Sequence, residues 1–142
     1  MAGRSDVDLL EDLLVMEQRL ISMYEAGLRR DVVAADLAEE LLEQERLHVR
    51  GLQRALSGAG SRSPRAVAPS PALTAALGSR DAFARFALEL EAEAVSAYVD
   101  AAAAIRDPKL RQPLGSIMAC EAAHRVALRD ALGARPLVDY SG

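Results

Sequence analysis

The feature that most constrains the fold of this chain is a pair of Glu-x-x-His units, each set within an apolar helical stripe. Glu45 stands three residues before His48, and Glu121 stands three residues before His124. Residues three apart lie on neighbouring turns of one helix face, so each unit presents a carboxylate and an imidazole to a common point. Both units are predicted to face the interior, because apolar residues recur around them at helical spacing (Leu41, Leu42, Val49 and Leu52; Leu114, Ile117, Met118 and Leu128).

Two more glutamates lie on apolar stripes of the same kind. Glu17 stands among Leu10, Leu13, Leu14, Leu20 and Ile21, and Glu91 stands among Ala87, Leu88 and Val95. Each is followed seven residues later by a tyrosine, Tyr24 or Tyr98. The interval from Glu17 to Glu91 is 74 residues and that from Glu45 to Glu121 is 76, so the same order of features recurs. This recurrence indicates an internal duplication and a bundle with pseudo-twofold symmetry.

Apolar periodicity predicts four long helices, at residues 6–28, 31–57, 80–106 and 108–132. Residues typical of helix ends support these bounds: Ser5 or Asp6 before the first helix, Gly27 and Asp31 between the first two, Ser79 or Asp81 before the third, and Asp107 with Pro108 before the fourth. Pro113 predicts a kink or a later start in the last helix.

The segment between the second and third helices differs in composition. Residues 58–79 are rich in Gly, Ser and Pro, which predicts a connection crossing the outside of the bundle, with a short helical turn at 72–77. After Gly133 and Pro136 the remaining tail is too short for a fifth long helix. We therefore predict one all-α domain over residues 1–142, an antiparallel four-helix bundle of two helical hairpins joined by a long crossover.

The composition agrees with this fold and excludes several functions. Aromatic residues make up 4% of the chain and Trp is absent, so the core must be built from aliphatic residues, which pack readily between helices. The net charge is -4 and the basic residues form no block, which argues against nucleic acid as a partner. No segment has the pattern of a signal peptide or a membrane span, so we expect a cytoplasmic protein without a membrane partner. Cys120 is the one cysteine, and we interpret it as a small buried core residue.

Four carboxylates on apolar stripes need a counter-charge. Burying a bare carboxylate costs several kcal/mol or more, unless it is protonated, paired or bound to a cation. No Lys or Arg lies consistently on the four stripes, so the simplest counter-charge is a bound metal cation. The charge of four carboxylates balances that of two divalent cations. Mixed oxygen and nitrogen donors suit iron or manganese better than structural zinc. The alternative to a metal site is that these residues are exposed and form salt bridges on the surface of amphipathic helices.

With this ligand pattern, residues 6–133 resemble the ferritin-like superfamily of di-iron carboxylate proteins, which includes bacterioferritins and rubrerythrins. The resemblance implies that Glu17 and Glu91 are terminal ligands, that Glu45 and Glu121 bridge two iron ions, and that His48 and His124 each ligate one. Manganese or a mixed pair is the alternative. The resemblance also implies that oxygen or hydrogen peroxide reacts at the reduced pair. Tyr24 and Tyr98 are interpreted as core residues whose hydroxyls satisfy the buried carboxylates.

The chain departs from these relatives at several points. Bacterioferritins carry a haem-ligating Met after the Glu of the first Glu-x-x-His unit, whereas this chain has Arg46, so no haem is expected. The Cys-rich module of rubrerythrins and the fifth helix of ferritin cages have no counterpart in the sequence. These departures favour a compact monomer or homodimer as much as a larger, shell-like homo-oligomer.

Two classes of function follow from this pattern. The leading hypothesis is an oxidoreductase of ferroxidase or peroxidase type, in which the metal pair reacts with oxygen or peroxide. The alternatives are a bundle that stores, buffers or senses metal without catalysis, and a di-iron oxygenase that acts on an organic substrate.

Overall fold

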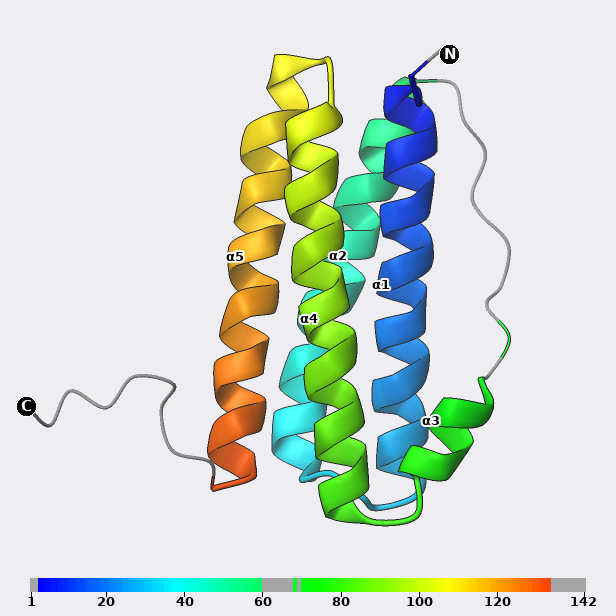
Figure 1. Cartoon of the computed structure of the whole chain (residues 1–142), viewed down its shortest axis with the longest axis vertical. Coiled ribbons are helices and arrows are strands. Elements are labelled where there is room, and N and C mark those ends of the chain that lie inside the picture. The colour runs from blue at the N-terminus through cyan, green and yellow to red at the C-terminus, as the bar shows by residue number, and fades with distance from the viewer. Residues whose placement is uncertain (1–2, 60–67, 69, 134–142) are drawn as a thin grey trace, which may run out of the picture.

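The computed structural model describes residues 3–59, 68 and 70–133. Four long helices and one short helix account for most of these residues: α1 (Asp6–Arg29), α2 (Ala35–Gly58), α3 (Pro71–Ala76), α4 (Arg80–Ala104) and α5 (Pro108–Ala131) (Figure 1). The short helix α3 falls where the sequence predicted a helical turn. Part of the predicted crossover, residues 60–67 and 69, and the tail from residue 134 that includes Pro136 lie outside the described residues.

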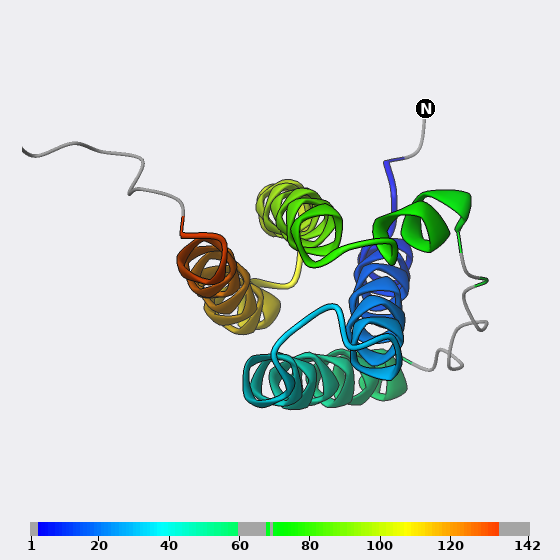
Figure 2. The ribbon, with the colours of Figure 1, turned by 90° about the horizontal axis from the view of Figure 1, so that it is seen from below.

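The long helices form an antiparallel bundle, as predicted. α1 packs against α2 and α4 packs against α5, so each half of the chain makes one hairpin. α1 also packs against α4, which joins the two hairpins, and α2 lies beside α5 on the other side (Figure 2). α1 and α5 run in one direction while α2 and α4 run in the other (Figure 1).

Side-chain caps begin three of the long helices. Ser5, one of the two residues predicted to cap α1, accepts a hydrogen bond from the backbone N–H of Asp8 at 3.1 Å, and the Asp8 carboxylate accepts from the Ser5 N–H at 2.9 Å. This reciprocal capping box satisfies two backbone donors that a helix start otherwise leaves free. Ser79 caps α4, and Asp107 caps α5 with Pro108 at the first helical position.

The turn between α1 and α2 corrects two predictions. Gly27 does not end α1, which continues to Arg29. Asp31 does not cap α2 but adopts a left-handed conformation with φ 54°. The N–H groups of Asp31 and Val32 bond to the carbonyls of Leu28 and Gly27, the pattern of a Schellman C-cap. Because Asp31 closes the first helix, α2 starts only at Ala35, four residues later than predicted.

The turn between α4 and α5 is tied to the start of α1. α4 ends at Ala104, two residues before the predicted end, because Ile105 turns to an extended conformation with its side chain buried. The backbone N–H groups of Arg106 and Asp107 each donate to the Asp6 carboxylate at 2.9 Å, and these two bonds hold the pKa of Asp6 below its ordinary value. α5 begins before Pro113, so the later start does not occur.

The apolar core consists of two clusters separated along the bundle axis. One lies toward the α1–α2 turn and is built around Leu20, Met23, Leu41, Phe83 and Leu90. The other lies toward the α4–α5 turn and is built around Leu10, Leu14, Leu52, Ile105 and Leu114. The residues between them are Glu17, Glu45, Glu91 and Glu121, each near the middle of its helix. A polar layer therefore divides the core into two halves.

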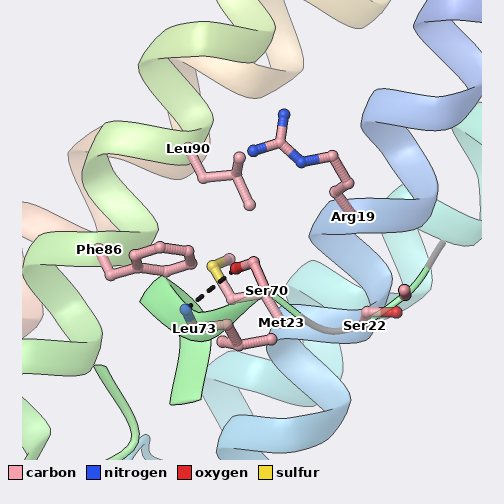
Figure 3. A pocket seen from close by; sticks show the side chains of 8 residues that line it. Arg19, Ser22, Met23, Ser70, Leu73, Phe86 and Leu90 are labelled. Atoms are coloured by element: carbon pink, nitrogen blue, oxygen red, sulfur yellow. Dashed lines mark hydrogen bonds between the residues drawn. The ribbon is translucent and has the colours of Figure 1, made fainter. Parts of the chain in front are cut away.

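The short helix α3 covers the outside of the first cluster. Ser70 caps it by accepting from the Leu73 N–H at 3.1 Å, the contact drawn in Figure 3. A small pocket lies between α1, α3 and α4 beside this cap, and Arg19, Met23, Phe86 and Leu90 line it. None of the four buried glutamates lines this pocket, which is formed where α3 packs against α1 and α4. Within the described part of the chain, no helix is long and apolar enough to span a membrane.

The close packing of Gly27 on Phe83 gives a test of the fold. A Cβ atom on Gly27 would stand 2.5 Å from Phe83 Cζ, and Phe83 is buried with 1% exposure. Gly27→Ala should lower the free energy of unfolding by about 1–3 kcal/mol, because overpacking forces the ring to move. Gly115→Ala is the matched control on α5, where a Cβ would meet no atom within 4 Å, and it should raise stability by about 0.5–1 kcal/mol. Chemical denaturation measures both, and equal effects would contradict this packing.

Candidate metal centre

The six side chains singled out by the sequence come together in the polar layer. Glu17 is supplied by α1, Glu45 and His48 by α2, Glu91 by α4, and Glu121 and His124 by α5. All four glutamates have 0% exposure, and the two histidines have 8% and 2%. The structure therefore excludes the alternative of exposed residues on amphipathic helices.

The two histidines lie at the centre of equivalent sets of contacts. His48 Nδ1 stands 2.9 Å from Glu121 Oε1, 3.1 Å from Glu45 Oε2 and 3.4 Å from Glu17 Oε2. His124 Nδ1 stands 3.0 Å from Glu45 Oε1, 3.0 Å from Glu121 Oε2 and 3.4 Å from Glu91 Oε1. The ring centroids are 6.0 Å apart with the ring planes at 21°. Glu45 and Glu121 thus contact both imidazoles, whereas Glu17 and Glu91 contact one each.

These contacts define two groups of four residues, each able to offer four ligand atoms within 4.8 Å of one another. The first is Glu17, Glu45, His48 and Glu121, and the second is Glu45, Glu91, Glu121 and His124. Oxygen donors with one imidazole nitrogen are a suitable set for a first-row transition metal. The layer can therefore hold a metal ion, and Glu45 and Glu121 are common to both groups.

Several polar atoms of this layer are buried without a hydrogen-bond partner. The imidazole nitrogens are close to the carboxylates, but six atoms lack hydrogen-bond geometry: Glu17 Oε2, Glu45 Oε1, Glu91 Oε2, Glu121 Oε1, Glu121 Oε2 and His124 Nδ1. Leaving one such group unsatisfied costs about 1–3 kcal/mol, and more if it is charged. Within the described residues, no Lys or Arg forms an ion pair with any of these four carboxylates. These unpartnered atoms belong to the residues that could hold a metal ion.

The two tyrosines cross between the hairpins. The Tyr24 hydroxyl of α1 donates to Glu91 Oε1 on α4, and the Tyr98 hydroxyl of α4 donates to Glu17 Oε1 on α1. Burial, and then the charge of the neighbouring carboxylates, raises the pKa of both phenols well above the ordinary range, so both remain donors. The other carboxylate oxygen of each glutamate, Oε2, is buried without a hydrogen-bond partner.

Burial and mutual contacts also shift the pKa values of the acidic and imidazole groups. Burial raises the pKa of Glu17 well above its ordinary value and raises that of Glu91 to about 8. For Glu121, burial is outweighed by the contacts with both histidines, which hold its pKa at about 2. Burial likewise opposes charge on His48, but its contacts with the carboxylates, Glu121 first, raise its pKa to about 12, and His124 is raised for the same reason.

Two residues beside this layer were not assigned correctly from the sequence. Cys120 was interpreted as a core residue, but it is half-buried, and its Sγ lies 3.0 Å from Gln44 Oε1 on α2. Gln44 Oε1 also accepts from His124 Nε2 at 2.8 Å. Sequence reasoning overlooked Gln44, although its place directly before Glu45, matching that of Cys120 before Glu121, was a usable signal.

The other acidic residues near the ligands lie outside the layer. Glu39, Glu40, Glu43, Glu89 and Glu93 are exposed. Glu25 is half-buried and pairs with Arg46 at 3.3 Å. Arg46, which stands where bacterioferritins have a haem-ligating Met, is thus engaged on the surface of the α1–α2 hairpin.

Comparisons with known proteins agree with this architecture. A family described as a ferritin-like domain matches residues 5–134. Among solved structures, a conserved hypothetical protein of Mycobacterium tuberculosis, rv2844, superposes with a TM-score of 0.79 at 21% sequence identity, over 96% of each chain. That similarity shows a shared fold. No curated protein matches the chain.

The pKa shifts predict how the stability of the metal-free protein depends on pH. The pKa of Glu91 is 4.5 in the unfolded chain and about 8 in the folded protein. The pKa of His48 is 6.5 in the unfolded chain and about 12 in the folded protein. The folded state therefore binds more protons across this range, so stability falls as pH rises. Below pH 4.5 the sign reverses, because Glu121 must be protonated against its lowered pKa.

We expect the melting temperature of chelator-treated protein to be highest at about pH 5 and to decline toward about pH 9. Glu91→Gln should flatten the part of this decline that lies between pH 4.5 and 8, because an amide does not titrate there. Calorimetry across the pH range measures both proteins. A melting temperature that stays level or rises from pH 5 to 9 would show that these groups are not buried together.

Proposed function

The chain belongs to the ferritin-like domain family, and from this premise we propose that it binds two iron ions and uses them to reduce oxygen or hydrogen peroxide. The observation that carries the proposal is the pair of buried ligand groups that share Glu45 and Glu121. Two ligand groups that share two carboxylates can hold a pair of neighbouring ions. A single group of four ligands would hold only one ion.

The proposed ligands divide between the two ions according to the contacts of the layer. Glu17 and His48 would hold one ion, Glu91 and His124 would hold the other, and Glu45 and Glu121 would contribute to both. Four carboxylates balance the charge of two divalent ions, which removes the cost of burying acidic groups between two apolar clusters. Manganese, or one ion of each metal, fits the same donor set.

Bound iron would supply the redox chemistry, because two Fe²⁺ ions could pass two electrons, with two protons from solvent, to oxygen or hydrogen peroxide. The protein contributes orientation and a site screened from water. Tyr24 and Tyr98 hold Glu91 and Glu17 from opposite hairpins, so the carboxylates supplied by α1 and α4 are fixed relative to each other. The apolar clusters above and below restrict water, which strengthens electrostatic interactions within the layer.

Metal loading tests the ligands. Wild-type protein loaded anaerobically with Fe²⁺ is expected to hold two ions per chain. A Glu45→Gln, Glu121→Gln variant should lose both ions, because each change replaces one carboxylate oxygen with an NH2 group and removes a negative charge from both ligand groups. A Glu40→Gln, Asp130→Asn variant changes exposed carboxylates on the same two helices and should load like wild type. Elemental analysis of desalted protein gives the ratio, and a bridging-site variant that keeps two ions contradicts the proposal.

Reaction with the oxidant separates catalysis from storage. Loaded wild-type protein should develop a ferric absorbance when mixed with oxygen or peroxide, and further Fe²⁺ should be oxidised over many turnovers. A bundle that stores metal would instead retain many irons per chain in a large assembly, which mass measurement of the loaded particle detects. A loaded protein inert to both oxidants would leave buffering or sensing as its function.

A further inference from the structure

The two halves of the metal centre differ at the residue that precedes each Glu-x-x-His unit. Gln44 precedes Glu45 and Cys120 precedes Glu121, so they occupy equivalent places 76 residues apart in the repeat. They meet across the α2–α5 side of the bundle, where Cys120 Sγ donates to Gln44 Oε1 at 3.0 Å. The glutamine side chain is longer and ends in a strong acceptor, whereas the cysteine ends in a weak one.

Gln44 reaches across to the histidine of the other half. Its Oε1 accepts from His124 Nε2 at 2.8 Å, while Nδ1 of the same ring faces Glu45 and Glu121 at 3.0 Å. The bond fixes the rotation of the imidazole and keeps the proton on the outer nitrogen. The inner nitrogen is then free to act as a ligand. A protonated and a metal-bound imidazole both retain this Nε2–H, so the contact persists in either state.

His48 has no equivalent support. Its Nδ1 contacts the carboxylates, but among the residues that the structure describes no side chain accepts from its Nε2. Cys120, the counterpart of Gln44, approaches His124 of its own helix, with Sγ and Nε2 3.4 Å apart. His48 is also the more exposed of the two rings, at 8% against 2%. The His48 imidazole is therefore oriented only by its contacts with the carboxylates of the polar layer.

We propose that the two metal positions differ in affinity, and that Gln44 is the positioning residue that makes the His124 position the tighter one. This inference rests on the proposed two-metal site and adds an order of filling to it. A divalent ion occupies the His124 position first and leaves it last. The ion beside His48, nearer to solvent, is the one that exchanges.

Titration of metal-free protein with Zn²⁺, a redox-inert probe, tests this asymmetry without any turnover. Calorimetry of the wild type should resolve two steps of different affinity, one ion each. Gln44→Leu should weaken the tighter step by about 10–100-fold, as loss of a ligand-orienting partner does, and leave the weaker step unchanged. Gln44→Glu keeps an acceptor oxygen and should retain the tighter step. Gln53→Leu, nine residues further along α2, is the control and should match wild type.

The chain has only two histidines, so NMR of the imidazole nitrogens identifies the filled position in the wild type even if a variant folds poorly. At one equivalent of Zn²⁺ the His124 ring should show metal-shifted nitrogens while His48 remains as in the metal-free protein. Simultaneous filling of both positions, or an equal loss in both steps for Gln44→Leu, overturns the asymmetry and leaves the two-metal proposal standing. Wild-type protein that binds no metal overturns both.

Discussion

Four carboxylates buried at the middle of the bundle, with two imidazoles as their ionic partners, are the constraint on which the rest of the structure depends. Each glutamate lies near the centre of a long helix and has 0% exposure. An uncompensated charge at such a place costs several kcal/mol. The apolar residues therefore form two separate clusters, one on each side of the layer, and the tyrosines and histidines gather where the carboxylates need partners.

The two halves of the chain supply equivalent partners for the buried carboxylates. Each hairpin supplies one lone glutamate, one tyrosine and one Glu-x-x-His unit, and each tyrosine bonds to the glutamate of the other hairpin. The symmetry is broken where Gln44 and Cys120 meet, because one strong acceptor serves one of the two histidines. A repeated fold can in this way give two equivalent ligand groups different surroundings without changing their ligand types.

The sequence was sufficient to predict the helices and the members of the polar layer, but not the details that depend on long-range contacts. Periodicity places Glu17 and Glu91 inside the bundle whatever the exact helix ends are, and this prediction was correct. Glycine is typical of helix ends, so the sequence suggested that Gly27 stops α1. In the structure Gly27 instead leaves space for the Phe83 ring of α4, a contact that no local sequence pattern reveals. Asp31 resembles a cap for the next helix, but its left-handed conformation closes the preceding one. Aligning the two halves of the sequence singles out Gln44, but its contact with His124 depends on how α2 and α5 pack together.

Anomalous diffraction from crystals soaked with Mn²⁺ is the most direct measurement of the central claim. The account predicts two anomalous peaks within the polar layer, one beside His48 and one beside His124, with Glu45 and Glu121 between them. A map with no peak in this layer, or with peaks only among the exposed acidic residues, would contradict it.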